Sequence, residues 1–179
     1  FANADDPSDP LNEKQYQTFS KATESYAMPK SMANSAAICS DMDCSFDWVR
    51  PGIMLYGVDP FVRGVTSDPG LQTVMTLSAT VISLQQFRKG EAIGYGGSWV
   101  CPEDMPVAII SIGYGDGYPR HAESGTPVLV SGIICPLVGR VSMDMICVDL
   151  SAVPKAALGD EVVLWGEGLA ADEVAEHAA

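Results

Sequence analysis

Apolar and polar residues alternate differently in the two parts of the chain. After residue 70, the run LQTVMTLSATVISLQQF alternates position by position, which is typical of a long, half-buried strand. Shorter apolar runs follow it, each bounded by turn residues: VAIISIG, TPVLVSG, PLVGRVSM, MICVDL and EVVLWGE. This spacing predicts an all-β barrel or sandwich, followed by a helix over 170–179.

The first part of the chain predicts strand–helix units of an α/β domain. Residues 9–28 carry loosely spaced apolar positions, with Asp9 as a cap and Pro10 at an early helical position, so we expect a helix there. WVRPGIMLYGV predicts a short strand that ends near Arg50. A tight turn should follow at Pro51-Gly52, because proline is disfavoured inside a central strand.

The composition changes at TSDPG, residues 66–70, where we expect a hinge between two domains. The predicted domains are an α/β part over residues 1–65 and an antiparallel β domain over residues 66–179. A chain of 179 residues that is 47% hydrophobic has enough apolar material for such cores.

Charge and cysteine content exclude several classes of function. A formal net charge of -13 disfavours binding to nucleic acid or to anionic membrane surfaces. No apolar run is long enough to span a bilayer, and the opening FANADDPSDP has no secretory signal. Five cysteines without a CxxC pair and only two histidines predict no disulfide framework and no metal site, so we expect free thiols in the cytoplasm.

Two motifs in the first part could bind a phosphate. The Pro-Gly turn in RPGIMLYG can expose backbone N–H groups, and Arg50 beside them adds a cation. Ser35 lies in the small-residue loop ANSAA and could contribute a hydroxyl to the same phosphate. The simpler interpretation is a strand end with a surface charge and a serine that caps a helix.

Three motifs in the second part could face a ligand. Tyr95 lies between glycines in IGYGGSW, where a ligand can approach closely, and Tyr114 has a similar setting in GYGDGYPR. Met143 follows a predicted strand in GRVSMDM, and its backbone N–H could face a carboxylate. The commoner role of such residues is packing, in the core or at the edge of a sheet.

Taken in order, MANSAA, DWVRPGIMLYGVDP, GYGGSWV, SIGYGDGYPR and VGRVSMDMICVDL resemble the successive motifs of bacterial alanine racemases. The segments FDWVRPG and GYPRH are most similar to those of the catabolic, proteobacterial branch. The resemblance implies a pyridoxal phosphate enzyme of fold type III. This chain would hold the last strand–helix units of a (β/α)8 barrel and a β-barrel-like C-terminal domain that is incomplete at its end.

The resemblance also implies roles for the cofactor-binding candidates. Ser35 and the amides of Gly52 and Ile53 would bind the phosphate of pyridoxal phosphate, and Arg50 would contact its pyridine nitrogen. Because an arginine does not give up its proton, the ring would stay unprotonated, which favours simple proton return over transamination.

The remaining candidates would serve the substrate, alanine. Tyr95 would be the catalytic tyrosine, contributed to the active site of the other subunit of a homodimer. Met143 would hold the substrate carboxylate through its backbone, and Tyr114 would line the entrance corridor. A phenol titrates near pH 10, about 3 units from neutrality, so we expect a nearby cation or hydrogen-bond donor to assist Tyr95.

In the family a lysine serves the second face of the substrate and binds the cofactor covalently. None of the five lysines in this chain lies in that motif, and the chain begins without methionine. We therefore expect a piece of a longer protein that on its own neither racemises alanine nor binds the cofactor covalently. Two alternatives remain open: a broad-specificity amino-acid or serine racemase, and a non-catalytic β-barrel binding module.

Overall fold

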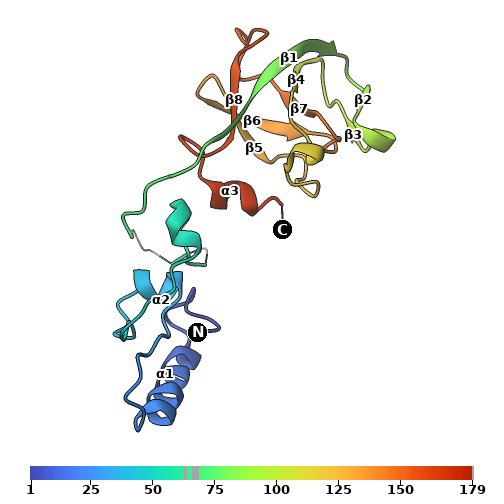
Figure 1. Cartoon of the computed structure of the whole chain (residues 1–179). Helices are drawn as coiled ribbons and strands as arrows, with labels where there is room; N and C mark the ends of the chain where they lie inside the picture. Colours follow the sequence, from blue (N-terminus) through green and yellow to red (C-terminus); the bar gives the residue numbers. More distant parts are fainter. Residues whose placement is uncertain (63, 66–68, 179) are drawn as a thin grey trace. The chain divides into compact units, whose positions relative to one another are not determined.

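The structure, a computed structural model, describes residues 1–62, 64–65 and 69–178 (Figure 1). The chain divides into two compact units, Phe1–Val74 and Met75–Ala179. Of the expected hinge at 66–70, residues 66–68 lie outside the described residues.

The first unit begins with helix α1, Pro10–Thr23. Its predicted start is confirmed, because the Asp9 side chain accepts a hydrogen bond from the Leu11 N–H and Pro10 is the first helical residue. The predicted end at Met28 is wrong by five residues. Beyond Thr23 the apolar side chains are exposed, 69% in the case of Met28, so a further turn would gain no packing.

The predicted strand over residues 48–50 is not formed. Among the described residues, a single parallel bridge forms there, between Ser31 and Trp48, although the Arg50 N–H also donates to the Ala33 carbonyl at 2.9 Å. A strand needs continued backbone pairing, and Pro51 has no N–H to continue it. A 3-10 turn, η1, follows over Ile53–Tyr56.

A short helix, α2, occupies Ser35–Cys39 in the same unit. The Asn34 side chain caps it by accepting from the Ala37 N–H at 3.1 Å. Small residues form the core around it: Ala4, Ala33, Ala36, Ala37 and Cys44. This close packing of small side chains fixes the backbone that presents Ser35.

The second unit contains a closed antiparallel barrel of six strands in the order β1-β4-β7-β6-β5-β8, with β8 pairing back to β1 (Figure 1). The strands are β1 Leu77–Phe87, β4 Met105–Ile110, β5 Pro127–Val130, β6 Ile133–Val138, β7 Ile146–Asp149 and β8 Glu161–Trp165. The predicted β domain is therefore confirmed, as a barrel and not a sandwich. The first strand begins at Leu77, later than the alternating run from residue 71, because its pairing with β8 begins with Leu77 opposite Trp165.

The barrel interior is filled by inward-facing aliphatic side chains, as the alternation along the strands predicts. Tyr118 joins this core at 2% exposure, and its ring stacks on Trp165 with centroids 6.0 Å apart. Burial raises the pKa of Tyr118 to about 12, and its hydroxyl has no hydrogen-bond partner among the described residues.

A two-stranded hairpin, β2 Ala92–Ile93 and β3 Trp99–Val100, extends from the barrel between β1 and β4. Ile93 packs into a second core of this unit, together with Cys101, Met105, Val107 and Val138. The helix predicted over 170–179 is present as α3, Ala171–Ala175. Among the described residues, no helix combines the length and apolar character needed to cross a membrane.

Candidate active site

Tyr95 lies on a 3-10 turn, η2 Tyr95–Gly97, at the tip of the β2–β3 hairpin. The flanking residues Gly94 and Gly96 have φ of 78° and 72°, in the left-handed region that glycine adopts without strain. The Tyr95 side chain is 60% exposed. The glycine-rich turn thus presents this phenol to solvent and keeps it out of the apolar core.

A close backbone approach holds this turn against the loop that follows β6. A Cβ atom added to Gly94 would lie 2.9 Å from the backbone nitrogen of Arg140. A Cβ atom added to Gly139 would lie 3.1 Å from the carbonyl oxygen of Ile93. Side chains at these positions would separate the two segments. The position of Tyr95 relative to Arg140 therefore depends on two glycines.

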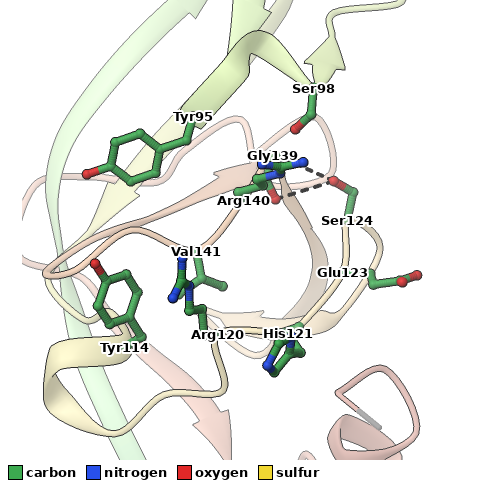
Figure 2. Close-up of a pocket in the computed structure, with 11 residues that line it drawn as sticks. Tyr95, Ser98, Tyr114, Arg120, His121, Glu123, Ser124, Gly139, Arg140 and Val141 are labelled. Carbon is green, nitrogen blue, oxygen red and sulfur yellow. Dashed lines mark hydrogen bonds between the residues drawn. The ribbon is translucent and has the colours of Figure 1, made fainter.

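Tyr95 opens onto a pocket of about 930 Å³ within the second unit (Figure 2). The pocket is lined by Tyr95, Ser98, Tyr114, Arg120, His121, Ala122, Glu123, Ser124, Gly139, Arg140 and Val141. Tyr114 comes from the 3-10 turn η3, Tyr114–Asp116. Two of the residues predicted for the substrate site thus line one cavity.

The pocket also contains cations that were not predicted from the sequence. The Arg120 guanidinium lies over the Tyr114 ring, 5.2 Å from its centroid, and Arg140 lines the same pocket. The whole chain has only 10 Lys and Arg against 23 Asp and Glu, and Glu123 is the pocket's one carboxylate. Two arginines at one cavity of an acidic chain favour an anionic ligand there.

Met143, the residue expected to hold a carboxylate, lies beside the Tyr114 turn and not among the residues that line the pocket. Its carbonyl accepts from the Gly115 N–H at 2.8 Å, and the Ser142 carbonyl accepts from the Tyr114 N–H at 3.0 Å. Within the described residues, the Met143 N–H donates to no protein acceptor. This donor is therefore available to a ligand.

The candidates for phosphate binding gather in the first unit. The Ser35 hydroxyl is nearly buried and accepts from the N–H groups of Gly52, at 2.7 Å, and Met54, at 3.4 Å. The Ile53 N–H between them has no acceptor in the described part of the chain. A hydroxyl and a turn of amides therefore converge at one place, while their expected role in phosphate binding stays a prediction.

Arg50 lies next to this group but does not bond to Ser35. Its guanidinium donates to the Ser31 hydroxyl at 2.7 Å and to the Met32 carbonyl at 3.3 Å. These bonds hold the side chain against the segment that leads into α2. Arg50, Ser35 and Gly52 thus form one cluster built from two chain segments.

Family comparison identifies both parts of the chain. The family described as "Alanine racemase, C-terminal domain" matches residues 74–179, and the one described as "Alanine racemase, N-terminal domain" matches residues 1–60. The chain belongs to the alanine racemase family. The predicted resemblance is therefore confirmed, and with it the predicted fold class.

Individual relatives agree with this assignment. An alanine racemase from Coxiella burnetii is 52% identical over 99% of this chain and 50% of its own length. The solved structure of the biosynthetic alanine racemase from Pseudomonas aeruginosa has a TM-score of 0.93 and 46% identity over 99% of this chain and 49% of its own. That of the Bartonella henselae alanine racemase, with covalently bound pyridoxal phosphate, has a TM-score of 0.87 and 36% identity at 99% and 49% coverage.

The chain spans about half the length of the curated relatives it matches. The closer resemblance to the catabolic branch stays a prediction, since a relative named biosynthetic is also among the similar structures.

Proposed function

We propose that this chain serves a pyridoxal phosphate-dependent racemase that interconverts L-alanine and D-alanine. The observation that carries the proposal is the pocket at Tyr95. An exposed phenol on a glycine turn shares a cavity with two arginines, in a chain whose relatives are alanine racemases. The covalently bound pyridoxal phosphate of the Bartonella henselae relative supports the same cofactor here.

The residues of the first unit suit the phosphate of this cofactor. The Ser35 hydroxyl accepts hydrogen bonds from two amides and so keeps its own hydrogen for a phosphate oxygen. The Ile53 N–H adds a second donor, which is unbonded within the described residues. The space between Gly52 and Ser35 is open, because a Cβ atom added to Gly52 would lie 3.6 Å from the Ser35 hydroxyl oxygen, an ordinary contact distance. We assign Ser35, Gly52 and Ile53 to phosphate binding.

Arg50 would face the pyridine nitrogen. Its bonds to Ser31 and Met32 orient the guanidinium before any ligand binds, and an arginine donates a hydrogen bond without transferring its proton. When bound, pyridoxal phosphate withdraws electrons from the substrate α-carbon, and an unprotonated ring does so less strongly. Arg50 would therefore favour return of the proton over competing reactions.

Tyr95 would move the α-proton on one face of alanine. A racemase needs acid–base groups on both faces, and a tyrosine requires stabilisation of its phenolate to act near neutral pH. Arg120 and Arg140 line the same pocket and would place positive charge there. The Met143 N–H would bind the substrate carboxylate, and Tyr114 would line the entrance to the site.

The assembly and domain boundaries follow from the same proposal. We infer a homodimer in which Tyr95 serves the active site of the other subunit. We also infer an α/β part over residues 1–65 and a β domain over residues 66–179. All five cysteines are free thiols in the structure, which fits the reducing environment of the cytoplasm.

A direct assay tests the proposal. The protein, expressed from its complete reading frame, is incubated with L-alanine or L-serine, with and without added pyridoxal phosphate, and the D-enantiomer is measured. We expect cofactor-dependent formation of D-alanine and a higher kcat/KM for alanine than for serine. A folded protein that racemises neither amino acid would refute the function, and equal kcat/KM values would favour a broad-specificity racemase.

A further inference from the structure

The orientation of the Met143 N–H is determined by the neighbouring turn. This N–H and the Ser142 carbonyl belong to the same peptide group, which is trans, as are all peptide bonds in the described residues. In a trans peptide the N–H points away from its own carbonyl. Because the Ser142 carbonyl accepts from the Tyr114 N–H, the Met143 N–H is directed away from the Tyr114 turn.

Gly113 lies against this peptide more closely than any side chain would allow. A Cβ atom at Gly113 would come within 2.3 Å of the Ser142 oxygen and 2.4 Å of the Met143 oxygen. The backbone of Gly113 is extended, with φ of -150° and ψ of -166°, so an alanine could adopt it. The requirement for glycine here is therefore steric and not conformational.

Gly113 itself has little freedom to move away from the loop. Its N–H donates to the Asp116 carboxylate at 3.0 Å, and its carbonyl accepts from the N–H groups of Asp116 and Tyr118. Tyr118 is in turn buried in the barrel core. A methyl group at Gly113 would thus displace the Met143 loop, where Met143 is 52% exposed.

The geometry points to Gly113 as a positioning residue for the substrate carboxylate: it allows the 142–143 peptide to lie where the Met143 N–H can bind that group. This inference rests on the proposed function, because it assumes that Met143 holds the carboxylate. It extends the proposal to a residue that acts through its close contact with the 142–143 peptide.

Steady-state kinetics of Gly113→Ala test the inference, again with the protein expressed from its complete reading frame. Losing a hydrogen bond to a charged group weakens binding by roughly 10-fold or more. We expect the KM for alanine and the inhibition constant of acetate, a simple carboxylate probe, to rise together by this factor. The value of kcat should change less, because the groups that transfer the proton are untouched.

Two further variants separate positioning from general destabilisation. Gly132→Ala introduces strain at φ of 79° in the β5–β6 hairpin, where an added Cβ meets nothing within 4 Å, so it should lower the Tm without altering KM. Gly115→Ala places a Cβ 2.9 Å from the Met143 oxygen and should raise KM less than Gly113→Ala. It also provides the test if Gly113→Ala does not fold.

The outcomes distinguish this inference from the proposed function. If the wild-type protein has no racemase activity, the proposed function itself is refuted. With an active wild type, equal KM changes in Gly113→Ala and Gly132→Ala would overturn the positioning role. A fall in kcat at unchanged KM and unchanged acetate inhibition would overturn it as well.

Discussion

Alkaline pH should destabilise the barrel through one phenol, that of Tyr118. The side chain is 2% exposed, and burial raises its pKa from 10.0 to about 12 because the phenolate would lose its hydration in the core. The folded state therefore holds this proton more tightly than the unfolded state does. The resulting stability is complete below about pH 10 and is lost as the pH rises towards 12.

The pKa difference sets the size of the effect. About 2 pKa units at roughly 1.4 kcal/mol per unit amount to about 2.7 kcal/mol over the whole interval. At pH 11 only part of the loss has occurred, about 1.4 kcal/mol of unfolding free energy. Tyr118→Phe removes the ionisable group and should abolish this part of the pH dependence.

Urea unfolding of the wild type and Tyr118→Phe at pH 8 and pH 11 provides the measurement. At pH 8 the variant should be at least as stable as the wild type, because the hydroxyl it removes has no hydrogen-bond partner in the described part of the chain. At pH 11 the unfolding free energy of the variant, relative to that of the wild type, should be higher by a further amount of about 1.4 kcal/mol. Cys135, whose pKa burial raises to about 11, affects both proteins equally. An identical pH dependence in the two proteins would refute the reasoning.

Three other substitutions test separate parts of the account. Ser35→Ala should weaken binding of pyridoxal phosphate by roughly 10-fold, measured by fluorescence titration, and an unchanged Kd would remove Ser35 from the phosphate site. Arg50→Glu should raise the ratio of keto acid to racemised alanine, and a constant ratio would contradict the role given to Arg50. Leu137→Ala, at a side chain that is 0% exposed in the barrel core, should lower the unfolding free energy by about 2–5 kcal/mol. Ile134→Ala, at an exposed position on the same strand, should lower the unfolding free energy far less. Equal losses of unfolding free energy in the two variants would argue against the described core.

Local patterns predicted the elements whose formation depends on local chemistry. The helix start at Asp9-Pro10 was predictable because capping is decided within a few residues. The alternation in β1 predicted a strand, but its start at Leu77 depends on where β8 begins to pair. The expected strand at residues 48–50 did not form for the same reason, because strand pairing depends on segments that are distant in the sequence.

The candidate site shows the same division. Tyr95 could be predicted because its flanking glycines indicate a thin, exposed turn. The contributions of Arg120 and Arg140 could not, because the two residues reach one pocket from different loops. The available signal was the presence of both arginines in glycine-rich motifs of an otherwise acidic chain. Closure of the barrel likewise required the long-range pairing of β8 with β1.

Exchange of the α-hydrogen in deuterated water tests most directly the claim that Tyr95 transfers a proton on one face of alanine. In Tyr95→Phe, racemisation should fall by roughly 100-fold or more. One enantiomer of alanine should still take up deuterium at the α-carbon, while the other should not. The variant Tyr26→Phe, which removes an equally exposed phenol elsewhere, should exchange both enantiomers as the wild type does. Unchanged racemisation in Tyr95→Phe, or retained exchange of both enantiomers, would contradict the account.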